Sequence, residues 1–248
     1  KEVISAFADY EQLVGGIDTL FKDSSASLQE YANNAYKTAG LSANDYMETI
    51  TGFSASLLQS LNGDTAKVAE VGNMAVTDMA DNANKMGTDM ASIQNAYQGF
   101  AKQNYTMLDN LKLGYGGTKS EMQRLLSDAQ KITGIKYDIN NLNDVYQAIH
   151  VIQGKLDITG TTAKEASTTI QGSVSAMKSA WQNMLTGIAT GDTGTIGDLV
   201  NNLVDSVITA SQNILPRVQE IANGITAVLP EIITKINENL PTLLKSGI

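Results

Sequence analysis

The chain has 248 residues, of which 42% are hydrophobic, 6% aromatic and 17% charged, and its formal net charge at pH 7 is −9. This length allows a substantial core in one or two domains. The acidic balance disfavours a surface that grips nucleic acid, which needs clustered Lys and Arg, but it is compatible with a surface along which DNA slides. Cysteine is absent, and the single histidine, His150, excludes metal sites that need two histidines.

No run of eighteen apolar residues occurs, so the sequence predicts no ordinary membrane span, and no secretory signal pattern opens it. The sequence starts at Lys1 without a methionine and stops at Ile248 inside an apolar pattern. We therefore expect it to be part of a longer protein.

Apolar residues recur at helical spacing through the first hundred positions. They predict a helix from Glu2 to about Phe21, a second ending at Gly40, a third capped by Ser42 and a fourth capped by Asp64. The fourth helix has a narrow face of small residues, which is typical of close packing against another helix. Its methionines favour a soft packing surface over a partner-binding groove.

A glycine corner interrupts this pattern. Helical spacing from Tyr105 through Leu111 ends at Gly114, Gly116 and Gly117. We interpret these glycines as a structural corner between two helical pieces, where glycine permits positive φ.

The next helix has a recognisable start. Thr118 and Glu121 have capping-box spacing, in which the threonine oxygen accepts a backbone N–H and the glutamate caps the threonine in return. The run 116–120 also resembles a phosphate-binding loop, but Thr118 stands where that motif needs a glycine before Lys119. A structural corner is therefore the favoured interpretation.

Beyond the corner we expect a short helix ending near Gly134 and then an extended connector, because the alternating residues 135–139 have no partner strand. Asn141 or Asn143 would cap the following helix. Thr162 and Glu165 form a second capping box.

Trp181, the only tryptophan, lies on the apolar face of the helix that follows Gly172. We interpret it as a core or helix-interface anchor rather than a ligand platform.

The run Gly191–Gly197 is the clearest linker and a candidate domain boundary. After it, Leu-Pro pairs recur at 215, 229 and 240, and each is expected to start a short apolar helix, since proline is tolerated in a first helical turn. The expected regions are 1–113 (N-terminal helices), 114–190 (helical core region), 191–197 (linker) and 198–248 (apolar Leu-Pro repeat).

The sequence thus predicts an all-α fold of amphipathic helices joined by glycine-rich turns, in a helical bundle within a homo-oligomer. No pair of carboxylates has the spacing of a general acid and base, and His150 is best explained as an ordinary solvated or packed residue. The pattern predicts no catalytic residue, no cofactor and no metal, so an enzyme is the least favoured class.

Several ordered blocks resemble the core region of phage tail tape-measure proteins. The first is the stretch 96–126 with its glycine corner, the second joins 148–153, 160–166 and 169–173, and the third joins Ser179–Asn183 with Asn213–Pro216. The likeness runs from about Ala75 to Pro216.

The resemblance implies a mostly helical virion protein, made in the bacterial cytoplasm and packed in several copies, in threefold- or sixfold-compatible number, in the lumen of the tail tube. Such proteins set tail length and leave ahead of or with the DNA. Their neighbours are tail-tube and tail-tip proteins and, at ejection, the host inner membrane. Because an α-helix rises about 1.5 Å per residue, residue number becomes a length. The glycines indicate that this piece is folded back and compact rather than the ruler itself.

The alternative from another class is a membrane-active or pore-forming helical protein, which the Leu-Pro repeat favours. The discriminating observation is the full reading frame, since a tape-measure protein would continue for hundreds of helical residues.

Overall fold

The computed structural model describes residues 2–190 and 193–245. Within these ranges every regular element is a helix and none is a strand, which confirms the all-α class. In chain order, with η for a short 3-10 helix, the elements are α1 (Glu2–Phe21), η1 (Lys22–Ser24), α2 (Ser25–Thr38), α3 (Ala43–Ser60), α4 (Thr65–Met86), α5 (Met90–Ala101), η2 (Leu108–Leu111), α6 (Lys119–Thr133), α7 (Leu142–Lys155), α8 (Thr161–Thr168), α9 (Ile170–Thr190) and α10 (Thr193–Lys245).

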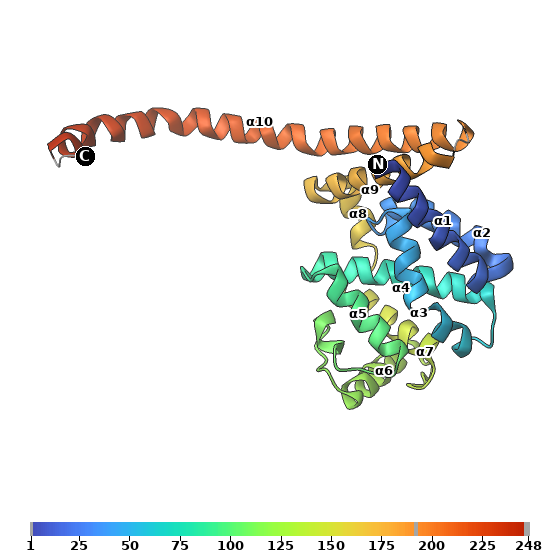
Figure 1. Cartoon of the computed structure of the whole chain (residues 1–248). Helices are drawn as coiled ribbons and strands as arrows, with labels where there is room; N and C mark the ends of the chain where they lie inside the picture. The colour runs from blue at the N-terminus through green and yellow to red at the C-terminus, as the bar shows by residue number, and fades with distance from the viewer. Residues whose placement is uncertain (1, 191–192, 246–248) are drawn as a thin grey trace.

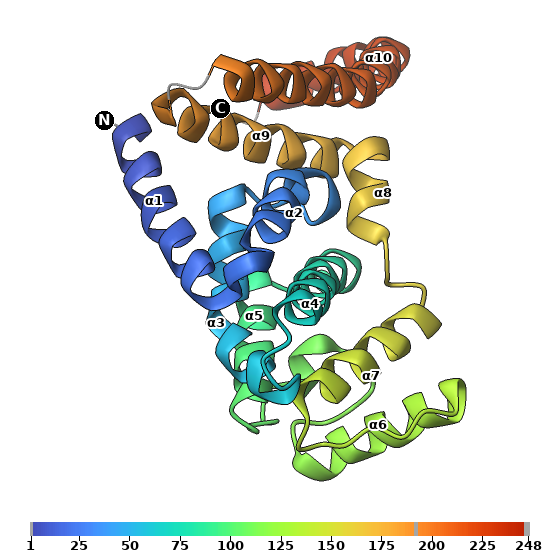
Figure 2. The ribbon, with the colours of Figure 1, turned by 90° about the vertical axis from the view of Figure 1, so that its right-hand side faces the viewer.

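The hydrophobic core is built around α4, which packs against α1, α2, α3, α5, α7 and α8 (Figure 2). One cluster of buried side chains extends from Ile17 to Ile158. The close packing expected from small residues occurs at Gly72, where a Cβ atom would lie 2.7 Å from Ile50 Cδ1. Since both sides of the glycine corner contribute to this cluster, the expected regions 1–113 and 114–190 share one core as far as Ile158.

Glycine breaks and local caps set most helix ends as the sequence predicts. Gly40, Gly63 and Gly134 have positive φ at or just beyond the ends of α2, α3 and α6. Ser42 Oγ, the Asp64 carboxylate and Asn141 Oδ1 each accept a backbone N–H three residues on, at the starts of α3, α4 and α7 respectively.

The segment before the corner differs from the prediction. α5 ends at Ala101, and only the short 3-10 helix η2 forms before Gly114. The reason lies in the side chains: Leu108 and Leu111 are buried in the core, and Tyr105 Oη donates to the Ile139 carbonyl 2.9 Å away. Residues 135–138 form a connector without regular structure and 139–140 form a turn, so no strand forms there, as predicted.

The C-terminal prediction is wrong in two respects. Residues 193–197 of the expected linker belong to α10, while residues 191 and 192 lie outside the described residues. A Cβ atom at Gly187 would overlap Leu199 Cδ1, so α9 and α10 pack closely, and this packing outweighs the low helix propensity of Gly194 and Gly197.

The Leu-Pro pairs also do not start separate helices. α10 is one helix that runs through Pro216, Pro230 and Pro241. A proline removes one backbone hydrogen bond, but apolar residues recur at a seven-residue period across all three sites in the sequence, and this pattern favours one continuous helix.

Figure 1 shows the resulting shape. The helices α1–α7 form a compact body, α9 lies between this body and α10, and the C-terminal half of α10 projects beyond the body. At about 1.5 Å per residue, the 53 residues of α10 span roughly 80 Å.

Candidate functional site

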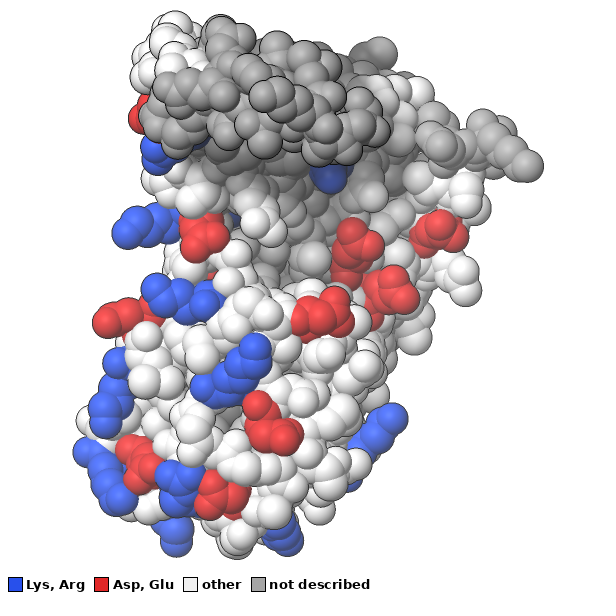
Figure 3. All heavy atoms as spheres, turned by 90° about the vertical axis from the view of Figure 1, so that its left-hand side faces the viewer, with Lys and Arg blue, Asp and Glu red and all other residues white. Residues whose placement is uncertain are grey.

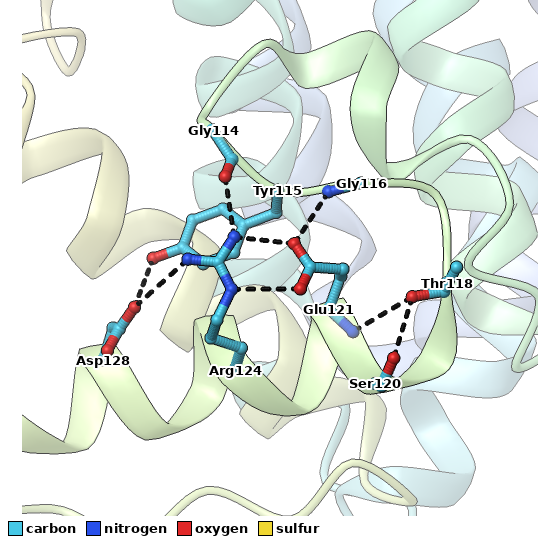
Figure 4. Close-up of polar contacts among 8 residues, drawn as sticks. All are labelled: Gly114, Tyr115, Gly116, Thr118, Ser120, Glu121, Arg124 and Asp128. Atoms are coloured by element: carbon cyan, nitrogen blue, oxygen red, sulfur yellow. Dashed lines mark hydrogen bonds and ion pairs between the residues drawn. The ribbon is translucent and has the colours of Figure 1, made fainter.

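The glycine corner is held by one arginine (Figure 4). Gly114 has φ +87°, and its carbonyl accepts a hydrogen bond of 2.7 Å from Arg124 Nη2. The Arg124 guanidinium lies 4.3 Å from the centroid of the Tyr115 ring and makes a two-point contact with the Glu121 carboxylate, at 2.6 and 3.1 Å. The corner is thus a local structural unit, as the sequence indicated.

The three corner glycines have different roles. Only Gly114 has a positive φ among the three. A Cβ atom at Gly117 would overlap the carbonyl of Thr106, so glycine is required there for close approach of two chain segments. At Gly116 a Cβ would make only an ordinary contact, 3.5 Å from Glu121 Cγ.

The capping box at Thr118 forms in part. Thr118 Oγ1 accepts the Glu121 N–H at 3.2 Å, as predicted. Glu121, however, accepts the N–H of Gly116 at 3.0 Å instead of that of Thr118, because the corner brings Gly116 over the first turn of α6. Hydrogen bonds from Arg124 and from this N–H lower the Glu121 pKa to about 2. A carboxylate therefore occupies the place where a bound phosphate would lie, which argues against the phosphate-loop interpretation.

The second capping box, at Thr162 and Glu165, does not form. Gly160 with φ +81° precedes α8 and no local side chain caps it, while Thr162 Oγ1 is buried without a hydrogen-bond partner among the described protein atoms. The cap comes from Asp81 on α4, whose carboxylate accepts the N–H groups of Gly160 at 2.6 Å and Thr162 at 2.8 Å. Tertiary packing has replaced the local cap with a carboxylate 79 residues away.

Sequence reasoning missed a buried polar turn on α4. Asp78, Asp81 and Asn82 are at most 1% exposed. The Asp78 carboxylate lies 2.9 and 3.0 Å from His150 Nδ1 on α7, and Asn82 Nδ2 donates to the Leu111 carbonyl at 3.0 Å. The available signal was the i, i+3, i+4 spacing of these polar residues on a helix of small residues. The same spacing also occurs on helix faces that are exposed to water.

Burial and hydrogen bonding shift the pKa of Asp78 in opposite directions. Removal from water raises the Asp78 pKa, which the hydrogen bond from His150 partly offsets. The same hydrogen bond raises the pKa of His150, whose side chain is 37% exposed. Asp78 is buried and ties α4 to α7, so we assign the pair to structure rather than to catalysis. Among the described residues no group of three His, Asp or Glu side chains could hold a metal ion.

Trp181 is not a core anchor. It is 49% exposed on α9, whose fully buried positions are small or polar. Small side chains let α9 lie close to the body, and the large indole is left on the flank of the helix. Trp181 lines a groove of about 480 Å³ with α1 and α3 on one side, and an apolar groove of about 560 Å³ with Met177, Leu203 and Val207 on the other.

The helix α10 carries a group of exposed apolar side chains. Seven side chains of this helix are 41% to 66% exposed, namely Val200, Val204, Val207, Ile208, Leu215, Val218 and Ile221. Leu199, Leu203, Ser206 and Ala210 lie on the side toward α9 and are buried or partly buried.

These exposed residues belong to three columns along the helix, and within each column successive members are seven residues apart. The columns read Val, Val, Ile, Ile, Val at 200–228, Ile, Leu, Ala, Leu, Ile, Leu at 208–243, and Val, Ser, Val, Ile, Ile at 204–232. Such a sustained heptad pattern is typical of a helix that packs in a coiled coil. The sequence already contains this heptad signal, which favours one helix, whereas the Leu-Pro pairs predicted several short ones.

Charges on the face in Figure 3 are mixed. Lys and Arg side chains lie among Asp and Glu over the lower body and do not gather into one basic patch. This face therefore lacks the clustered positive charge that gripping nucleic acid requires.

None of the helices in the described part of the chain is both long enough and apolar enough to cross a membrane. Comparisons of the chain with protein-family models, with curated proteins and with solved structures find no match.

Proposed function

We propose that this chain is a region of a phage tail tape-measure protein, a structural protein that lies in the lumen of the tail tube, sets tail length during assembly and is ejected ahead of or with the DNA. The observation that carries the proposal is the outward apolar side of α10, which continues in heptad register beyond the body. The ordered blocks within residues 75–216 resemble that family, and this resemblance supports the choice of family.

The geometry of α10 suits a role in which copies assemble around an axis. Exposed apolar side chains in three adjacent columns make a face broader than the two-column seam of a simple coiled coil. A broad face is best buried against several helices, which agrees with a threefold- or sixfold-compatible copy number. Tail-tube and tail-tip proteins would surround this bundle.

The body has a different part in this proposal. Its helices fold back on one core, so its residues do not add to length at 1.5 Å each. Its polar side chains cap helix ends and join helices. DNA is a neighbour in the tube rather than a ligand, in keeping with the mixed charges in Figure 3.

Tail length tests the proposal directly. Deleting residues 215–235 from the parent gene removes three heptads in register and should shorten the tails by about 30 Å, while duplicating the same residues should lengthen them by about 30 Å. Tail length would be measured by electron microscopy of purified particles. Tails of unchanged length in both strains would contradict a measuring role for α10.

The same exposed face supports the membrane-active alternative. Short of spanning a bilayer, α10 could lie in the interface with its apolar side toward lipid. The helix carries five acidic and three basic residues, so anionic lipid does not attract it by charge, and binding would be hydrophobic and insensitive to salt. Co-sedimentation with neutral and anionic vesicles distinguishes the tail role from the membrane-active role. Strong binding that does not change with salt concentration favours the membrane-active role, and no binding favours the tail role.

A further inference from the structure

The chain changes its mode of packing after Ile158. We call residues 2–158 the body and α8–α10, residues 161–190 and 193–245, the arm. The body buries large side chains such as Phe53, Tyr97 and Ile149 in one cluster, and that cluster contains no arm residue. Among the described arm residues, no Leu, Ile, Val or Phe is fully buried, and the buried positions are Ser173, Ala176, Ser179, Ala180, Asn183, Thr186, Gly187, Ser206 and Ala210.

Hydrogen bonds hold the arm where apolar packing is thin. Ser179 Oγ donates to the Gly40 carbonyl at 3.0 Å, and Asn183 Oδ1 accepts the N–H of Ala43 at 2.8 Å at the start of α3. Asp81 caps α8, which has no buried residue of its own. The neutral bonds contribute little net free energy because water replaces them when the arm leaves, and the two bonds to the Asp81 carboxylate contribute more.

Grooves follow the contact between the two parts. A groove of about 480 Å³ lies beside the contact of α9 with α1 and α3, one of about 300 Å³ lies among α2, α8, α9 and α10, and one of about 200 Å³ lies among the α2–α3 turn, α4, α8 and α9. These grooves are open to solvent, so water already reaches the edges of the contact between arm and body.

We propose that α8–α10 form a detachable arm that leaves the body as one unit while the body stays folded. The body keeps its own core after this opening, and α9 and α10 remain packed on each other through Gly187 and Leu199. Contacts that bury few large apolar groups open at low free-energy cost. The inference concerns how the chain holds together and does not depend on the tail function.

The aromatic residues provide separate reporters for the two parts. All nine tyrosines lie at or before position 146, and the one tryptophan is Trp181 in the groove between arm and body. In a urea titration of the full chain, Trp181 emission should change at lower urea than the tyrosine near-UV circular dichroism. Hydrogen exchange should show arm amides in α8 and the body-facing side of α9 exchanging at least about tenfold faster than those of α3 and α4. Coincident transitions, with equal exchange in arm and body, would overturn the proposal.

Two single substitutions on α9 test whether contacts between arm and body set the Trp181 transition. Asn183→Ala removes a contact to α3 and should lower the urea midpoint of the Trp181 transition but not that of the tyrosine transition, while the neighbouring exposed Gln182→Ala serves as the matched control. If Asn183→Ala lowers both midpoints equally, arm and body unfold together and the proposal fails.

A crosslink gives the opposite test, since the chain lacks cysteine. A Cβ atom at Gly40 would lie 3.7 Å from Ser175 Oγ, so Gly40→Cys with Ser175→Cys can join body and arm. The positive φ of Gly40 strains the cysteine in the oxidised and the reduced protein alike, so these two forms are compared with each other. Oxidation should move the Trp181 transition up to the tyrosine transition, and reduction of the same protein should restore the gap. An oxidised, crosslinked protein that keeps the early Trp181 transition would contradict undocking.

Discussion

At the scale of single residues, two neighbouring corner glycines have unequal surroundings. A Cβ at Gly117 would overlap the Thr106 carbonyl, whereas one at Gly116 would make an ordinary contact with Glu121. We expect Gly117→Ala to lower the free energy of unfolding by about 1–3 kcal/mol, since the backbone must shift to admit the methyl group. Gly116→Ala is the control and should change it by no more than about 0.5 kcal/mol. Urea unfolding of both variants decides this, and equal losses would show that the approach to Thr106 is not tight.

His150 gives the protein a pH dependence of known sign. Its pKa is raised in the folded protein by the hydrogen bond that it donates to Asp78, so its stabilising contribution is complete below the unfolded pKa near 6.5 and is lost as pH rises through the higher folded value. Burial raises the pKa of Asp78, so protonation of this carboxyl also makes stability fall with rising pH, in the same direction as His150.

We therefore expect the free energy of unfolding to decrease between pH 6 and pH 8.5. His150 is the only histidine, so His150→Gln should flatten this profile. Urea midpoints at several pH values test it, and a wild-type profile that rises over this range would refute the assigned pair.

At the scale of elements, the helix ends separate into two kinds. Ser42, Asp64, Thr118 and Asn141 cap helices that begin at the next residue; sequence spacing identified the first three and left Asn141 and Asn143 as alternatives for the fourth. The start of α8 is capped by Asp81 from another helix, and Asn183 on α9 reaches the start of α3. Local spacing cannot reveal such caps, because the partner is positioned by packing.

The exposed columns of α10 predict self-association. Leu215, at 66%, is the most exposed of these side chains. Leu215→Glu should abolish or strongly weaken association of the full chain, because the substitution places a charge in the interface of every copy. Gln219→Glu, at an exposed polar position on the same helix, should leave association unchanged.

Sedimentation velocity over micromolar to tens-of-micromolar concentration measures both variants against the wild type. A wild-type chain that stays monomeric throughout would remove the bundle from the proposed function.

At the scale of the whole molecule, the chain joins a compact body to a long projecting helix (Figure 1). A compact domain of 248 residues has a radius of gyration of about 18 Å. Because α10 extends beyond the body, we expect small-angle X-ray scattering of the monomeric Leu215→Glu variant to give a clearly larger value. A radius near that of a compact domain would mean that α10 folds back in solution.

The sequence by itself determined the helical class and most helix boundaries. Apolar spacing, positive-φ glycines at 40, 63 and 134, and local caps act within a few residues, so their effect can be derived without knowing the fold. The heptad columns of α10 were available in the same way.

Only the tertiary structure decided the burial of Asp78 and Asp81, the exposure of Trp181 and the continuity of α10 through its prolines. Each depends on which neighbour covers a given face. Asp81 is buried because the start of α8 offers it two N–H groups, and Trp181 is exposed because α9 uses its small residues for the body. Polarity and size set what burial costs a side chain, but the partners that offset this cost come from distant parts of the chain.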